Sequence, residues 1–400
     1  MIKLFQRLAI FAIATVAVGA VVLTSCNKEE EINSSNYNGQ YETKSFGANV
    51  STKQIAQELA ETIRVKPEIA HEIHSAISTV VNYGLDENIT FYDILNTDKS
   101  VFLKPSANIS NLRSAINVST LQSLGLGSAD NYYGNLNIYW GYHDKWDKTT
   151  APTICYLDAN HTSTTAKGFS VVNGNIQEVE ITQEYFDSAV EPIIIINYNE
   201  IDYSRYPNFK NGERTKGSVI WLKPVITPGT TVTPADPWNN PSKIYSARFT
   251  AFESGGTQHD YFWAGGSEFK VISSYADIAS GSNQPLTAKF ACFFTRSDIK
   301  DNVQKSFSNC YLVPDWRPEL EEIGLAVIEE DGGGSDTIEL KIKISSVEVS
   351  ITVPIESLDD ELCNQMIERN VFIANLTSGN NYYSADDCKI YTDMQVTNRN

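Results

Sequence analysis

The sequence predicts a mainly β protein with antiparallel, sandwich-like sheets and an α-helical segment towards its N-terminal side, and so an α+β fold overall. Two patterns predict this. Apolar residues recur every three or four positions within residues 51–125, as along the buried face of a helix. From about residue 131 apolar and polar residues alternate instead, as in strands with one buried face. With 42% hydrophobic residues, the 400-residue chain can build a packed core.

The four-residue spacing predicts two consecutive helices. Ser51 and Gln54 have the spacing of a capping box, which starts the first helix. Pro67 suits the first turn of the second helix, and Gly84 suits its C-terminal cap. The apolar positions are Ile55, Leu59 and Ile63 in the first helix, and Ile69, Ile73 and Ile77 in the second.

Three later stretches predict strands. Residues 136–140 alternate, and residues 193–196 are four consecutive isoleucines, which predicts a strand buried on both faces. Residues 338–344 and 347–353 alternate on either side of Ser345-Ser346. This pattern predicts an antiparallel hairpin with one buried face and one face in water.

The net charge and the cysteine spacing argue against several classes of function for this protein. The chain carries 31 Lys and Arg against 49 Asp and Glu, a formal net charge of −18, which argues against a nucleic-acid partner. No CxxC pair is present, so a zinc cluster or a thioredoxin-like motif is not expected. The sequence leaves open whether buried thiols or up to two disulfides form among Cys155, Cys292, Cys310, Cys363 and Cys388.

The first 31 residues have the order of an export signal. Lys3 and Arg7 precede an apolar run from Leu8 to Val22, which as a helix of about 1.5 Å per residue is too short for a bilayer core of about 30 Å. This is typical of the apolar region of a signal peptide. Leu23-Thr24-Ser25-Cys26 follows at once, with Lys28, Glu29 and Glu30 just beyond it.

These residues resemble the lipobox and export tag of Bacteroidota surface lipoproteins. The resemblance implies that diacylglycerol is attached to the Cys26 sulfur, that the chain is cleaved after Ser25, and that the protein is exported to the cell-surface side of the outer membrane. The rest of the chain loosely resembles an uncharacterised group of such lipoproteins, which offers no catalytic residues to transfer.

We therefore expect five segments. They are a lipoprotein signal peptide over 1–25, a flexible tether over 26–50, a helical segment over 51–125, a central β domain over 131–313 and a C-terminal β domain over 314–400.

No catalytic, cofactor-binding or metal-binding residue is predicted. His71 and His74 are three positions apart, whereas the helical zinc motif needs four, so we expect a solvated helix face around Glu72. No GxSxG elbow is present. Residues Glu329 to Asp336 fit either a calcium loop or a solvated acidic turn, and the turn is favoured because EF-hand spacing is lacking.

Two weaker patterns concern sugars. Trp140, Trp146 and Trp263 lie in loop-like settings and are candidates for stacking a ligand, with burial in the core as the alternative. Ser188 and Thr337 each follow an Asp and precede an aliphatic residue, which looks like the O-glycosylation acceptor of Bacteroidota.

The expected function is a lipid-anchored outer-membrane protein, exposed at the cell surface, that binds a glycan or a peptide. Its partners would be the membrane, through the anchor, and that ligand. Two alternatives stay open: a secreted hydrolase whose site forms only in three dimensions, and a structural subunit of a surface assembly.

Overall fold

The computed structural model describes residues 52–82, 84–95, 109–116, 136–157, 164–198, 220–221, 238–257, 265–281, 283–330, 335–356, 359–385 and 388–399. The predicted signal peptide, lipidated Cys26 and tether lie outside these residues, and so does Trp263.

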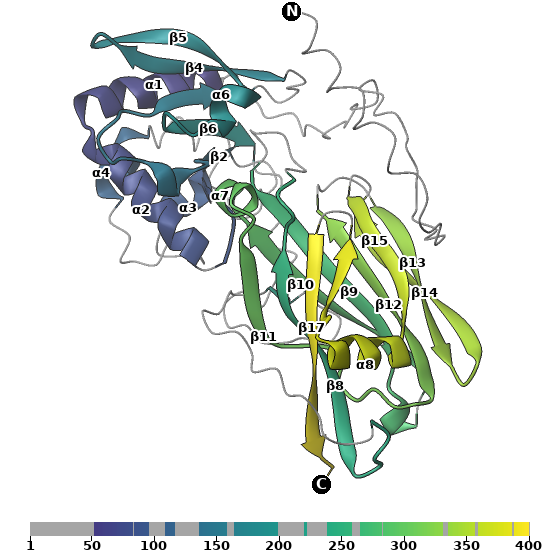
Figure 1. Ribbon diagram of the computed structural model, residues 1–400. Helices are drawn as coiled ribbons and strands as arrows, with labels where there is room; N and C mark the ends of the chain where they lie inside the picture. Colours follow the sequence, from purple (N-terminus) through teal and green to yellow (C-terminus); the bar gives the residue numbers. More distant parts are fainter. Residues whose placement is uncertain are drawn as a thin grey trace, which may run out of the picture. The chain divides into compact units, whose positions relative to one another are not determined.

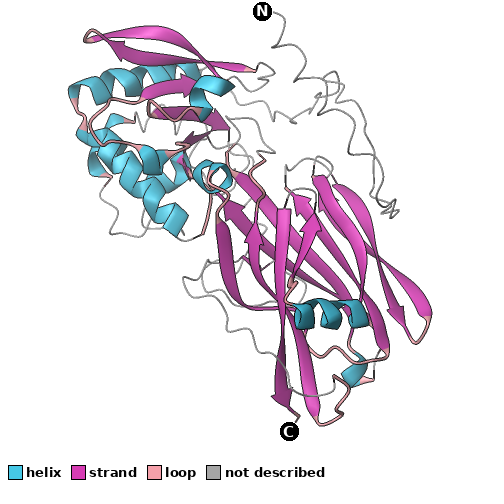
Figure 2. Ribbon diagram, viewed as in Figure 1, coloured by secondary structure: helices cyan, strands magenta, loops and turns pink. Residues whose placement is uncertain are grey.

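The first part of the described chain is a six-stranded sheet with helices packed on it (Figures 1 and 2). Its strand order is β1-β2-β6-β3-β4-β5, antiparallel except for the parallel pair β3 and β6. The strands are β1 Asn88–Thr90, β2 Leu136–Tyr139, β3 Thr153–Tyr156, β4 Thr165–Val172, β5 Asn175–Thr182 and β6 Ile193–Tyr198. The helical elements are α1 Thr52–Val65, α2 Glu68–Asn82, α3 Phe91–Leu95, α4 Ser110–Ala115, η2 His143–Lys145 and α6 Gln183–Asp187.

Strand β6 holds this sheet together because both of its faces are buried. Ile194 and Ile196 join the core beneath the helices, which includes the apolar stripes of α1 and α2. Ile193 and Ile195 join a smaller core on the opposite face, with Phe186 of α6. The predicted burial of the isoleucine run on both sides is confirmed.

The second part is built from two sheets that share one core. A seven-stranded sheet has the order β14-β13-β12-β9-β10-β7, with β15 also paired to β12, and a four-stranded sheet has the order β11-β8-β17-β16. Aromatic and aliphatic side chains from both sheets interdigitate between them, among them Phe249, Val271, Leu325 and Met394. The predicted α+β fold, rich in antiparallel β structure and sandwich-like, is confirmed.

The strands of this part are β7 Ile220–Trp221, β8 Lys243–Glu253, β9 Ser267–Ala276, β10 Pro285–Phe294, β11 Gln304–Val313, β12 Leu320–Glu329, β13 Ser335–Ile344, β14 Val347–Glu356, β15 Asp360–Glu368, β16 Tyr382–Ala385 and β17 Cys388–Asn398. Its helical elements are η4 Ile278–Ser280, α7 Arg296–Lys300 and α8 Arg369–Ser378.

The predicted hairpin is β13 and β14. Ser345 and Ser346 form its two-residue turn with φ of 46° and 70°, and Ile344 pairs with Val347. Positive φ at both turn residues matches the twist of the paired strands. The buried side of the hairpin covers the outer face of β9 and β12, where Leu340 meets Ile272 and Ala326. At the outer edge, β14 carries Pro354.

The predicted boundary at 313/314 falls within sheets that span it, and the predicted boundary at 125/131 lies outside the described residues. Strand β12 pairs with β9, and β17 pairs with β8 along most of its length, so residues 314–400 share sheets with the residues before them. The helices of the 51–125 segment likewise share a core with β2, β3 and β6. Strand partners far apart in the chain leave no local signal, so composition alone does not reveal these shared sheets.

The five cysteines beyond residue 26 all lie in the described part of the chain, and none of them forms a disulfide there. Cys155, Cys292, Cys310 and Cys388 are buried, and Cys363 is half-buried. Burial raises the pKa of the Cys155 and Cys292 thiols well above the ordinary value. The sulfur atoms therefore serve as small apolar groups in the core.

Glu253, at the end of β8, predicts an acid-dependent loss of stability. Burial raises the pKa of its carboxyl, but hydrogen bonds from Lys389, Tyr391 and Asn302 outweigh burial and hold the pKa below the ordinary value. Its stabilising contribution is therefore present above the unfolded-state pKa of about 4.3 and is lost as pH falls through the folded-state pKa. We expect Glu253→Gln to lower the free energy of unfolding by about 1–2 kcal/mol at pH 7 and by much less below about pH 4.

Urea titration at both pH values measures this difference. Glu348→Gln is the matched control, because Glu348 forms an exposed ion pair with Lys341. A Glu253→Gln deficit that is equally large at acid pH would contradict the prediction.

Candidate functional site

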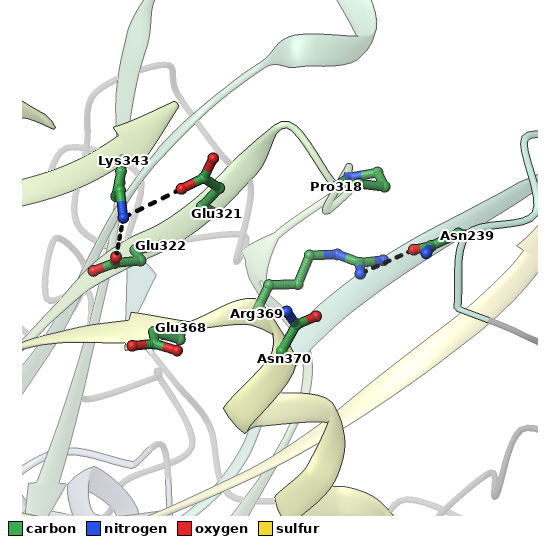
Figure 3. A pocket seen from close by; sticks show the side chains of 8 residues that line it. All are labelled: Asn239, Pro318, Glu321, Glu322, Lys343, Glu368, Arg369 and Asn370. Carbon is green, nitrogen blue, oxygen red and sulfur yellow. Dashed lines mark hydrogen bonds and ion pairs between the residues drawn. The ribbon is translucent and has the colours of Figure 1, made fainter. Parts of the chain in front are cut away.

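A polar pocket lies where β12, β13, β15 and the start of α8 meet (Figure 3). Its volume is about 380 Å³. The residues that line it come from four separate segments of the chain: Asn239, Pro318, Glu321, Glu322, Lys343, Glu368, Arg369 and Asn370.

Two carboxylates stand side by side in this pocket because of strand register. Glu322 on β12 is the direct partner of Glu368 on β15. Such partners have Cβ atoms about 4.5–5.5 Å apart, and like charges at this spacing repel each other. Lys343 offsets part of this repulsion, since its Nζ lies 3.2 Å from Glu322 and 3.3 Å from Glu321, and these contacts raise its pKa. Glu368 is exposed and has no ion-pair partner among the described residues.

Arg369 fixes the opposite wall of the pocket. Its side chain is buried, and its guanidinium donates hydrogen bonds to the carbonyls of Trp316 and Trp238 and to Oδ1 of Asn239. Burial lowers the pKa of this guanidinium from its high ordinary value. Through these three hydrogen bonds, Arg369 holds residues 238–239 against the end of β15 (Figure 3).

Residues Glu87 and His143 form a second, buried polar site next to α7. Glu87 Oε1 accepts a hydrogen bond from the Tyr142 N–H at 3.2 Å and lies 3.3 Å from His143 Nδ1. Glu87 Oε2 accepts from the Arg296 N–H at 3.0 Å. The Arg296 guanidinium donates from Nε to the carbonyl of Gly265 at 2.8 Å, and it lies 3.6 Å from the carboxylate of Asp187.

Asp86 extends this buried site. Its carboxylate accepts hydrogen bonds from the Gly266 N–H at 3.1 Å and from Asn88 at 2.8 Å. Burial, with the neighbouring charge of Glu87, raises the pKa of Asp86 to about 6. A Cβ at Gly266 would lie 2.0 Å from the carbonyl oxygen of Phe294, so only glycine allows this close approach.

The predicted stacking residues Trp140 and Trp146 are in the core. Trp140 is fully buried and Trp146 is 8% exposed, and their rings pack 4.9 Å apart. Neither presents a ring face to a ligand, so the alternative of core packing is correct for both. Their apolar surface gains more from burial beneath α2 than from exposure in a loop.

The predicted solvated face of His71 and His74 holds for His71, which is exposed, but not for His74. Glu72 is buried and accepts hydrogen bonds from Asn111 and from the Leu112 N–H, both at 2.8 Å. His74 is half-buried, and its Nε2 lies 3.2 Å from the carbonyl oxygen of His143. Helix α2 packs against α4, η2 and β1, so residues outside its apolar stripe are buried too.

Ser188 and Thr337 are both exposed, Ser188 after α6 and Thr337 on β13, and their glycosylation stays a prediction. Residues 331–334 of the segment predicted as an acidic turn, with a calcium loop as the alternative, lie outside the described residues, and Glu330 forms an ion pair with Lys270 at 3.0 Å.

No family model matches the chain, and neither curated proteins nor solved structures give a significant match. Within the described residues, the helices are too short or too polar to cross a membrane.

The anchoring of the pocket wall by Arg369 predicts a loss of stability on a mild substitution. Arg369→Lys keeps the charge but loses the planar fork, which leaves buried carbonyls without donors. We expect the free energy of unfolding to fall by about 2–4 kcal/mol in urea titration. Arg64→Lys, on the exposed side of α1, should leave it nearly unchanged. Equal stabilities for the two variants would show that the hydrogen bonds of Arg369 do not matter.

Proposed function

We propose that this protein is a lipid-anchored outer-membrane protein, exposed at the cell surface, whose folded part binds a peptide through a basic group. The anchor rests on the sequence around Cys26, which resembles a lipobox followed by an export tag. The binding role rests on one observation, the pocket in which Glu368 and Glu322 stand opposite each other.

The chemistry of the pocket favours a basic ligand. Three carboxylates line it against one lysine and one arginine: Glu321, Glu322 and Glu368 against Lys343 and Arg369. Lys343 is shared between two of the carboxylates, while Arg369 points its donors at neutral acceptors. An ammonium or guanidinium group placed beside Glu368 would relieve the repulsion across the strand pair.

A peptide fits this pocket better than a glycan. Sugar sites commonly offer an aromatic ring face, and the eight described residues that line the pocket include no aromatic residue. The net charge of −18 also favours the approach of a basic ligand over an acidic one.

The carboxylate pair also supports the alternative of a hydrolase, because paired carboxylates can act as acid and base in glycoside hydrolysis. Release of reducing ends from a panel of polysaccharides, lost in Glu368→Gln, would favour this alternative over a binding module.

The anchor predicts the location of the protein. Cys26→Ala removes the sulfur that would carry diacylglycerol, so the variant should move from the membrane fraction to the soluble fraction after a carbonate wash. Cys363→Ala, which changes another cysteine, should stay with the membrane. Full retention of Cys26→Ala in the membrane fraction would refute the anchor.

The pocket predicts charge-selective binding. In fluorescence polarisation, short labelled peptides with one Lys or Arg should bind, and the same peptides with Glu in that position should not. Glu368→Gln should weaken binding about tenfold, as expected for a charge-assisted contact of about 1.4 kcal/mol. Glu348→Gln, an exposed carboxylate outside the pocket lining, should bind like the unaltered protein. Binding that does not depend on the peptide charge or on Glu368 would contradict the proposal.

A further inference from the structure

Three side chains with metal-binding atoms converge beside α7. A carboxylate oxygen of Glu87, a ring nitrogen of His143 and a carboxylate oxygen of Asp144 all lie within 4.8 Å of one another. Glu87 comes directly before β1, and the other two residues open the short helix η2, so residues more than fifty positions apart supply the set.

The spacing of the Glu87 and His143 atoms matches that of two ligands on a single metal ion. Two atoms bound tetrahedrally to Zn²⁺ at about 2.1 Å lie about 3.4 Å apart. Glu87 Oε1 and His143 Nδ1 are 3.3 Å apart. One imidazole nitrogen with two carboxylates is a donor set suited to Zn²⁺, whereas Ca²⁺ and Mg²⁺ prefer oxygen ligands alone.

Outer contacts already orient the two carboxylates. The N–H groups of Tyr142 and Arg296 hold the Glu87 carboxylate, and the Ser297 hydroxyl donates to Asp144 Oδ1. Such outer partners are what metal sites use to fix the direction of their ligands. Asp144 is 43% exposed at its side chain, which leaves a path for an ion from solvent.

An independent observation points to the same place. The Tyr139 hydroxyl is buried and has no hydrogen-bond partner among the described residues. It lies against Gly141, where a Cβ would come within 2.5 Å of it, and Gly141 precedes the residue whose N–H holds Glu87. Glu87 and Asp86 are among the charges that act on this phenol. A buried hydroxyl without a partner needs an acceptor or a ligand water to offset its desolvation.

We propose that Glu87, His143 and Asp144 bind one divalent transition-metal ion of the Zn²⁺ type. His143 would bind as neutral imidazole through Nδ1, with its proton on Nε2, so the present contact between Nδ1 and Glu87 gives way to two bonds to the ion. The ion would tie the residue before β1 to η2 and, through the contacts of Ser297 and Arg296, to α7. The role expected of the ion is to stabilise this junction, and the set shares no residue with the peptide pocket.

The test measures Zn²⁺ binding to the full, tag-free chain in detergent by calorimetry, with metal content after dialysis as a second readout. We expect one ion per chain and a higher unfolding temperature with Zn²⁺ present. Asp144→Asn should weaken binding at least tenfold, and His143→Gln should abolish it. Co²⁺ should give visible absorption bands of a four-coordinate site, and these should be lost in His143→Gln.

Two matched controls separate this site from adventitious binding. Asp301→Asn removes a carboxylate that contacts Lys145, as Asp144 does, but lies outside the proposed set. His71→Gln removes an exposed imidazole on α2. Both should bind Zn²⁺ like the unaltered chain.

The exposed position of Asp144 makes its variant the deciding one, because Asp144→Asn should fold normally by circular dichroism even if His143→Gln does not. The proposal is overturned if the unaltered chain takes up no stoichiometric Zn²⁺, or if folded Asp144→Asn binds it with unchanged affinity.

Discussion

The carboxylate of Glu87 is completely buried, and an isolated charge in such a place would cost several kcal/mol of desolvation. It is offset by the backbone N–H groups of Tyr142 and Arg296, which donate hydrogen bonds to the carboxylate, and the ring of His143 lies 3.3 Å away. The hydrogen bonds that offset the desolvation of Glu87 therefore form only when the tertiary structure forms. The helix-covered sheet and the first turn of α7 must meet correctly, or this charge is left unsatisfied.

The local pattern of apolar and polar residues predicted those helices and strands whose structure is specified by neighbouring residues. The alternation on either side of Ser345-Ser346 specifies both faces of the β13–β14 hairpin, and its two turn residues close it without help from distant segments. The run from Ile193 to Ile196 predicted a strand covered on both sides, since such a run is too apolar for any other position. The apolar stripes of α1 and α2, around Leu59 and Ile73, could be recognised from the sequence in the same way.

The same pattern could not predict features that form only when residues far apart in the sequence become neighbours in the fold. Trp140 lies next to loop-like residues in the sequence, yet the packing of α2 above it decides that it is core. Glu322 and Glu368 become a pair only through the register of β12 with β15, across more than forty intervening residues. The same is true of Glu87 and His143, each of which is unremarkable in its own segment. By contrast, the lipobox-like segment is recognisable because the chemistry it resembles acts on contiguous residues.

Strand β14 forms the border of the larger sheet, and Pro354 lies near its end, with charged residues such as Glu348 along it. A proline has no N–H to offer, so the row of backbone donors along that border is interrupted. An uninterrupted edge strand can pair with the edge strand of another molecule and so start a fibre. The proline at position 354 opposes such edge-to-edge pairing along β14.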